Sequence, residues 1–162
     1  IKTYLFNPYT VAMALIGGGL VILWVEKRAF HPNIKSVEDM RWQDAIKVGL
    51  AQSVAMFPGV SRSGATIMGG MIFGLDRRVA TEFSFFLAIP MMFGASFLKL
   101  FKAGFSWSPL EWGALATGTI VAFVVSLLVI RFLMDYVKKH DFTYFAYYRI
   151  ALALVVLTLI FI

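Results

Sequence analysis

The 162-residue chain is 60% hydrophobic and 16% aromatic, and it carries a formal net charge of +6 at pH 7. A soluble domain is usually about 45–50% apolar, so this composition predicts a membrane protein. The basic residues fall mainly between apolar runs, where membrane topology accounts for them, and this argues against a nucleic-acid partner. The sequence contains no cysteine, which excludes disulfides, zinc–thiolate sites and thiol redox chemistry.

Several apolar runs are long enough to cross about 30 Å of hydrocarbon as helices. They cover about residues 8–25, 82–100, 110–133 and 145–162. The first run contains Gly17, Gly18 and Gly19, which suit close contact between helices in lipid. The pattern predicts an all-α, polytopic integral membrane protein, with residues 1–162 forming a single membrane domain.

Residues 42–75 consist of two shorter apolar helical pieces separated by Pro58-Gly59. Proline removes a backbone donor and glycine admits unusual backbone angles, so a helix is expected to stop there. Neither piece is long enough to span a membrane comfortably. The segment can be one long broken span, or a re-entrant helix hairpin whose tip at 58–63 stops inside the membrane.

The distribution of positive charge separates these two interpretations. Cytoplasmic loops of membrane proteins are enriched in Lys and Arg. A re-entrant hairpin at 42–75 places most of the basic residues on one side of the membrane, whereas a single broken span divides them almost evenly. We therefore predict the hairpin, which puts both ends of the chain outside the cytoplasm.

The tip of this hairpin carries polar groups that suit an anion. Non-helical backbone at membrane depth must be buried in protein or line a wet cavity. A helix starting near Ser63 would expose its first N–H groups and its positive dipole end there. Ser61, Ser63 and Thr66 add hydroxyl groups, and Arg62 adds a charged planar fork. Because burying an unused charge in a membrane is costly, we expect a site for a tetrahedral oxyanion, above all phosphate.

The segment FPGVSRSGAT, residues 57–66, matches the Pro-Gly-x-Ser-Arg-Ser-x-x-Thr motif of the bacterial undecaprenyl-diphosphate phosphatases, also called bacitracin-resistance proteins. Residues 82–90 and the pair Tyr148-Arg149 are similar to the same family, and the resemblance follows the whole chain in segment order. It implies a hydrolase that removes the terminal phosphate of undecaprenyl diphosphate and so recycles the lipid carrier of peptidoglycan synthesis.

The resemblance also implies where and how such an enzyme works. The expected location is the bacterial cytoplasmic (inner) membrane, with several spans and an active site that faces the periplasm. The implied fold is an inverted repeat with two re-entrant hairpins that meet at the centre. The implied cofactor is a divalent cation, Mg²⁺ or Ca²⁺.

One family motif is missing from this sequence. A Glu/Gln-x-x-x-Glu motif, followed by Ser and His residues, lies in the N-terminal half of such enzymes, and residues 49–57 here show Gln52 and Met56 without a carboxylate. The chain therefore resembles the C-terminal three-fifths of the enzyme. We expect it to supply the diphosphate-binding half, to be inactive alone, and to have the missing N-terminal half, the bilayer and undecaprenyl diphosphate as partners. Metal ligands are expected outside this chain, and a homodimer stays open.

The predicted site centres on Arg62, which would clamp the diphosphate and offset the charge that builds up during attack on phosphorus. Arg62 and Ser61 are the catalytic candidates; Ser61 would donate to a phosphate oxygen, cap the second half-helix, or do both. The substrate-binding candidates are Gly59, Ser61, Arg62, Ser63, Gly64, Thr66 and Arg149.

Three alternatives stay open at this point. Arg149 can bind a second phosphate or extend to the membrane interface. Glu82 can orient Arg62 or pair with Arg77 or Arg78 at the surface, and the surface pair is favoured. The same anion site would also suit a transporter or flippase of a phosphorylated polyprenyl lipid, which would bind the lipid without releasing phosphate.

Overall fold

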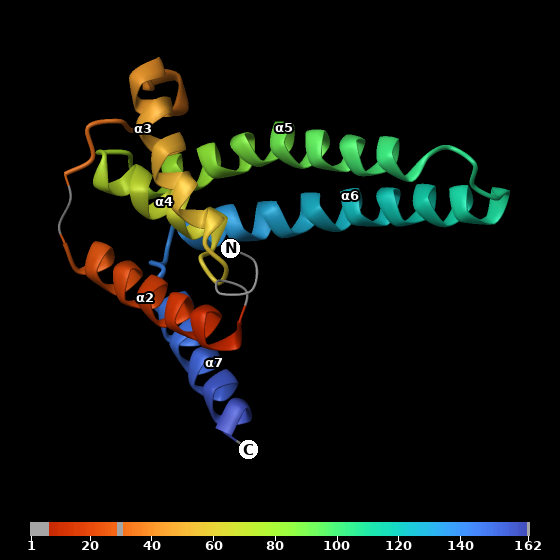
Figure 1. The fold of residues 1–162 in the computed structure, drawn as a ribbon. Helices are drawn as coiled ribbons and strands as arrows, with labels where there is room; N and C mark the ends of the chain where they lie inside the picture. Colours follow the sequence, from red (N-terminus) through yellow and green to blue (C-terminus); the bar gives the residue numbers. More distant parts are fainter. Residues whose placement is uncertain (1–6, 29–30, 162) are drawn as a thin grey trace. The chain divides into compact units, whose positions relative to one another are not determined.

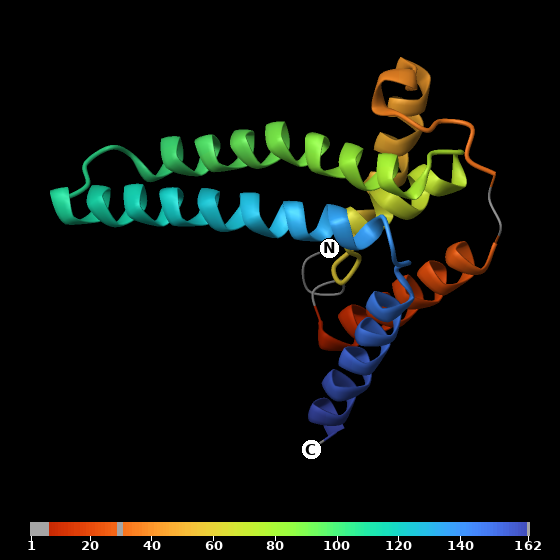
Figure 2. The same ribbon diagram turned by 180° about the vertical axis from the view of Figure 1, so that it is seen from behind.

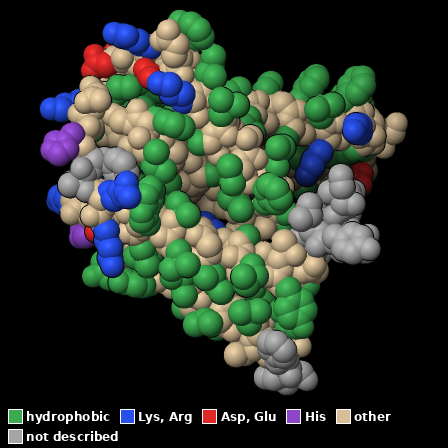
Figure 3. Space-filling model, turned by 60° about the vertical axis from the view of Figure 1, so that its left-hand side comes forward, with side chains coloured by type: hydrophobic (Ala, Val, Ile, Leu, Met, Phe, Trp, Pro, Cys, Tyr) green, Lys and Arg blue, Asp and Glu red, His purple; other side chains and the backbone are tan. Residues whose placement is uncertain are grey.

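The computed structural model describes residues 7–28 and 31–161, which fold into helices joined by short loops (Figure 1). The helices are α2 (Pro8–Lys27), α3 (Trp42–Ser53), α4 (Arg62–Ile72), α5 (Arg77–Ala103), α6 (Pro109–Val137) and α7 (Thr143–Phe161), with short 3-10 turns η1 (Val37–Asp39) and η2 (Val54–Met56). Four of them, α2, α5, α6 and α7, are long and apolar enough to cross a membrane. Hydrophobic side chains cover much of the exposed surface (Figure 3). The predicted all-α, polytopic membrane fold is confirmed.

The chain divides into two compact units. Residues 1–84 and 140–162 make the first unit, which carries α2, α3, α4, α7 and the start of α5. Residues 85–139 make the second unit, which carries the rest of α5 and all of α6. The candidate site residues all belong to the first unit.

The second unit is a pair of apolar helices that run in opposite directions (Figures 1 and 2). Helix α6 begins with a reciprocal cap: Glu111 N donates to Ser108 Oγ at 3.4 Å, and Ser108 N donates to Glu111 Oε2 at 2.7 Å. Beside this cap the ring centroids of Trp107 and Trp112 lie 5.4 Å apart. Such an aromatic pair is typical of the headgroup level of a bilayer.

Helices α2 and α7 pack closely in the first unit. A Cβ atom on Gly19 of α2 would lie only 2.7 Å from Ile150 Cγ1 and 3.1 Å from the carbonyl oxygen of Ala146, both on α7. The glycine run of α2 therefore allows the close helix contact that the sequence predicted. This contact fixes the register of α7 against α2, and with it the position of Arg149.

Helices α3 and α4 form a helical hairpin, with η2 and the loop 57–61 at its tip. The two arms meet at small side chains: Gly69 packs on Ala51 so closely that any added Cβ would collide with it. The helix breaks at Pro58-Gly59, as the sequence predicts, and Gly59 has a φ of +86°. The hairpin is thus present, whereas its re-entrant position in a membrane stays a prediction.

The end of the hairpin remote from the tip is joined to the preceding loop by backbone hydrogen bonds. Asn33 N and Ile34 N donate to the carbonyl oxygen of Gly74 at 2.9 and 3.1 Å, and Asp76 N donates to the carbonyl oxygen of Ile34 at 2.9 Å. We call this end the hairpin base. These paired backbone groups join the loop to the hairpin base.

Candidate functional site

The hairpin tip presents the start of α4. Ser61 is the N-cap: its Oγ accepts a hydrogen bond from Gly64 N at 3.1 Å, and its backbone is extended. The N–H groups of Arg62 and Ser63, in the first turn, have no acceptor within their own helix. With the dipole of an 11-residue helix behind them, these donors favour a negative group in front of the tip.

The tip is docked on α2 through Gly59. Its positive φ of +86° suits glycine best, because the Cβ of an L-residue crowds the backbone there. The space is also closed, since a Cβ on Gly59 would lie 2.7 Å from the carbonyl oxygen of Val11 and 2.9 Å from Ala14 Cβ. Glycine is therefore required at this position for two independent reasons.

Arg149 of α7 reaches the same place. Its Nη2 atom donates to the carbonyl oxygen of Gly59 at 3.0 Å and lies 3.5 Å from that of Ala14. Gly18 makes room for the guanidinium, because a Cβ there would lie 2.5 Å from Nη2. The guanidinium is thus held at the tip by two backbone oxygens, and α7 in turn helps to hold the tip.

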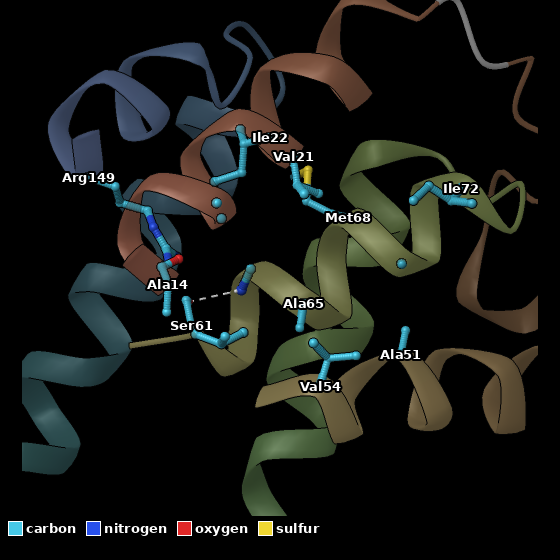
Figure 4. Close-up of a pocket in the computed structure, with 15 residues that line it drawn as sticks. Ala14, Val21, Ile22, Ala51, Val54, Ser61, Ala65, Met68, Ile72 and Arg149 are labelled. Atoms are coloured by element: carbon cyan, nitrogen blue, oxygen red, sulfur yellow. Dashed lines mark hydrogen bonds between the residues drawn. The ribbon is translucent and has the colours of Figure 1, made fainter. Parts of the chain in front are cut away.

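A cavity of about 370 Å³ opens beside the tip (Figure 4). One wall is a single face of α4, on which Ser61, Gly64, Ala65 and Met68 follow one another at helical spacing. The other walls come from α2, the end of α3 and Arg149, whose side chain extends toward Ala14 and Ser61 in Figure 4. The cavity is apolar apart from Ser61 and Arg149, so its polar groups are gathered at the tip.

The structure separates the predicted site residues into two groups. The cavity is lined by Ser61, Gly64 and Arg149. Arg62, Ser63 and Thr66 do not line it, because helical geometry turns them to other faces of α4. Ser63 is exposed, and Thr66 is fully buried. The binding and catalytic roles of all these residues stay predictions.

Two arginines at the tip carry buried nitrogen atoms without a hydrogen-bond partner among the described residues. These atoms are Arg62 Nη1 and Arg149 Nε. A buried donor without an acceptor costs free energy, so native structures rarely leave one unpaired. Two such donors, both on cations and both beside a helix N-terminus, are the groups expected at a site that receives an anion.

The chain matches a known family over nearly its whole length. The family model described as "Bacitracin resistance protein BacA" matches residues 1–155. This chain belongs to that family. The match confirms the resemblance seen in the segment 57–66.

Individual relatives show the same kinship. The chain is 50% identical over 157 residues to an undecaprenyl-diphosphatase of Nitrosomonas europaea. This match covers 97% of the chain and 58% of the relative. It is 53% identical to undecaprenyl-diphosphatase 1 of Clostridioides difficile, with 96% of this chain and 57% of the relative covered. It is 52% identical to undecaprenyl-diphosphatase 2 of Rhodospirillum rubrum, and that match covers 97% of this chain and 57% of the relative. The chain therefore spans about three-fifths of the length of the curated relatives that it matches.

This member of the family has one buried carboxylate that sequence reasoning missed. Glu26 is 3% exposed at its side chain and accepts from Arg77 Nε at 3.1 Å, from Arg77 Nη2 at 2.5 Å and from Phe142 N at 3.0 Å. We call these contacts the Glu26 clamp; they join the end of α2 to the starts of α5 and α7. The signal was available, because Glu26 continues the buried face of α2 at helical spacing from Gly19 and Ile22.

The Glu26 clamp corrects one expectation. Arg77 pairs with Glu26, and in the described part of the chain Glu82 makes no ion pair with Arg77 or Arg78. The predicted surface pair of Glu82 is therefore wrong. The physical reason is that α2 folds back onto the hairpin base and offers Arg77 a nearly buried carboxylate, which sequence neighbours could not reveal.

The described residues, 7–28 and 31–161, contain no group of three or more His, Asp or Glu side chains that could hold a metal ion. A divalent cation prefers several carboxylate or carbonyl oxygens, and the tip offers cationic and hydroxyl groups instead. The residues at the tip therefore do not fit the divalent cation that the family resemblance implies. That the metal ligands lie outside this chain stays a prediction.

Proposed function

We propose that the natural protein carrying this chain releases the terminal phosphate of undecaprenyl diphosphate, and that residues 1–162 supply the part that holds the diphosphate. In this reaction a water oxygen bonds to the terminal phosphorus while the bond from that phosphorus to the bridging oxygen breaks. The products are inorganic phosphate and undecaprenyl phosphate. The relatives named undecaprenyl-diphosphatase, at 50–53% identity over nearly all of this chain, support the proposal.

The observation that carries the proposal is a pair of buried donors, on Arg62 and Arg149, that have no hydrogen-bond partner among the described residues. A diphosphate offers several anionic oxygens, each an acceptor for a charge-assisted hydrogen bond. The guanidinium of Arg149, which lines the cavity, would donate to one phosphate oxygen, and Arg62 would donate from the neighbouring face of α4. Their positive charges would offset the negative charge on the terminal phosphate in the transition state.

The start of α4 would bind the same group through its backbone. The Arg62 and Ser63 N–H groups and the hydroxyl of Ser63 would donate to phosphate oxygens. Ser61 Oγ accepts from Gly64 N and shares a hydrogen bond of 3.2 Å with Ser63 Oγ, so one of these two hydroxyl protons is left to donate to the phosphate. In this account Ser61 orients the terminal phosphate, and the attacking water is deprotonated by a group outside the described residues.

The distribution of charge supports a direction for the site in the membrane. The tip contacts Val11 and Ala14 near the start of α2, whereas Lys27 and Arg28 follow at its other end, beside the hairpin base. Basic residues favour the cytoplasmic side. The base would therefore face the cytoplasm, the tip would open toward the periplasm, and the protein would lie in the bacterial inner membrane.

The remaining parts of the machinery are assigned to the portion of the relatives that this chain does not match. That portion makes up about two-fifths of their length. It would supply the base and any metal ligands, so residues 1–162 alone would bind the diphosphate without hydrolysing it. A homodimer stays a prediction.

The experiment is a phosphate-release assay on the natural protein in detergent, with undecaprenyl diphosphate as substrate and lipid binding measured in parallel. Release of one phosphate per lipid, with undecaprenyl phosphate as the other product, supports the proposal. Binding of the lipid without release would contradict it and would favour a transporter or flippase of a phosphorylated polyprenyl lipid.

A further inference from the structure

Gln52, on the arm of the hairpin that carries none of the predicted site residues, contacts the site-bearing arm. Thr66 Oγ1 donates to Gln52 Oε1 at 3.1 Å and to the carbonyl oxygen of Arg62 at 2.8 Å. A hydroxyl group has one proton to donate, so these two acceptors share it. The contact therefore couples α3 to the backbone of Arg62 through the side chain of Thr66, which lies after the first turn of α4.

The burial of Thr66 and the tight packing of the two arms make its hydrogen bond to Gln52 hard to replace. Thr66 is fully buried, so its hydroxyl cannot exchange these partners for water without opening the hairpin. One residue earlier on α3, Ala51 packs against Gly69 without room for another atom. The arms are thus close enough that Gln52 reaches Thr66, and a shorter or apolar side chain would leave the hydroxyl with Arg62 alone.

We propose that Gln52 is a positioning residue of the candidate site: through Thr66 it fixes the first turn of α4, and with it the guanidinium of Arg62. This inference rests on the proposed function, because it assigns Gln52 a part in holding Arg62 toward the diphosphate. It also gives Thr66 a different part from the one predicted from sequence. Thr66 acts through the Arg62 backbone and does not touch the phosphate.

The alternative is that the Gln52–Thr66 contact only holds the two arms together. The two roles make different demands on an experiment. A purely structural contact changes the unfolding temperature and leaves kcat/KM of the folded protein unaltered. A positioning contact lowers kcat/KM for phosphate release in protein that is fully folded, because Arg62 is displaced by a fraction of an ångström.

The test uses the natural protein with Gln52→Leu, Thr66→Val and the double variant, and Thr66→Ser as the conservative variant that keeps the hydroxyl. Gln43→Leu is the matched control, because Gln43 lies on the same helix and is exposed. We expect kcat/KM to fall about fivefold in Gln52→Leu and in Thr66→Val, the effect of one neutral hydrogen bond. Because both variants remove the hydrogen bond between Gln52 and Thr66, the double variant should lose less than the product of the two single losses.

Two outcomes decide the inference. Thr66→Ser should recover most of the activity, and Gln43→Leu should equal the wild type. If Gln52→Leu keeps the kcat/KM of the wild type while Thr66→Val loses it, or if the losses of the single variants multiply, the inference is overturned.

A second readout keeps the inference separate from the proposed function. Hydrogen–deuterium exchange of residues 60–68 reports the stability of the first turn of α4 without any need for hydrolysis. We expect faster exchange there in Gln52→Leu than in Gln43→Leu. If the wild type releases no phosphate, the proposed function fails while this exchange result still decides whether Gln52 fixes the turn. Equal exchange in the two variants would overturn the inference.

Discussion

Arg149 and Gly59 are 90 residues apart in the chain, and yet Arg149 Nη2 donates to the carbonyl oxygen of Gly59 at 3.0 Å. The contact joins the last helix to the tip of the hairpin. Arg149 therefore has two roles, since one nitrogen holds the tip while another, Nε, is buried and has no hydrogen-bond partner in the part of the chain that the structure describes. An arginine held in this way is already oriented before any anion arrives, which reduces the entropy lost on binding.

The docked tip predicts that Gly59→Ala is severely disruptive. An alanine would have to adopt the positive φ of Gly59, and its Cβ would meet the carbonyl oxygen of Val11. We expect a loss of stability of about 2 kcal/mol or more, together with weaker binding of undecaprenyl diphosphate. Thermal unfolding in detergent and a lipid-binding assay would measure the two effects.

The matched control for this change is Gly49→Ala. Gly49 lies inside α3 and has open space where a Cβ would be placed. Alanine should therefore stabilise the helix there by about 1 kcal/mol. If both substitutions had the same effect on unfolding, the close contact of the tip with α2 would be wrong.

The fixed guanidinium predicts that Arg149→Lys impairs binding although it keeps the charge. Lysine has no planar fork, so it cannot contact Gly59 and also direct a second donor toward a phosphate oxygen. We expect KM for undecaprenyl diphosphate to rise about tenfold, the value of one charge-assisted hydrogen bond. Arg131→Lys, at an exposed position on α6, should leave KM unchanged. An unaltered KM in Arg149→Lys would show that this arginine serves the fold alone.

The Glu26 clamp predicts a stability effect far from the tip. Glu26→Gln removes the negative charge that pairs with Arg77 and leaves the Arg77 guanidinium without a counter-charge. We therefore expect the free energy of unfolding to fall by about 2 kcal/mol. Asp135→Asn is the control, because the Asp135–Lys138 pair is exposed, with 72% and 46% of the side chains accessible, and such a pair contributes little to stability. Equal midpoints for the two variants in denaturant unfolding would contradict the importance assigned to the clamp.

The sequence predicted the features of this fold that depend on neighbouring residues. The apolar runs set the long helices through their length. The helical path of α3 and η2 ends at Met56, ahead of Pro58-Gly59, as proline's missing donor and the positive φ of glycine predict. The start of α4 followed from the same break, since Ser61 is a favourable N-cap.

Features that depend on distant contacts could not be predicted in the same way. Which residues of the motif face the cavity is decided by how α2 and α3 pack on α4 and by where α7 places Arg149, so the separation of Ser61 from Arg62 required the structure. The partner of Arg77 lies 51 residues away, and no local pattern names it. The short motif predicted the chemistry at the tip, but its geometry depends on three helices that the motif does not include.

The measurement that tests the central claim most directly is phosphate release from undecaprenyl diphosphate by the natural protein, wild type beside Arg62→Lys and the exposed control Arg78→Lys. We predict release by the wild type and by Arg78→Lys. For Arg62→Lys we predict a loss of about 100-fold in kcat/KM, because the charge remains while the planar donor to the phosphate is gone. Full activity in Arg62→Lys, or a wild type that binds the lipid and releases no phosphate, would contradict the account.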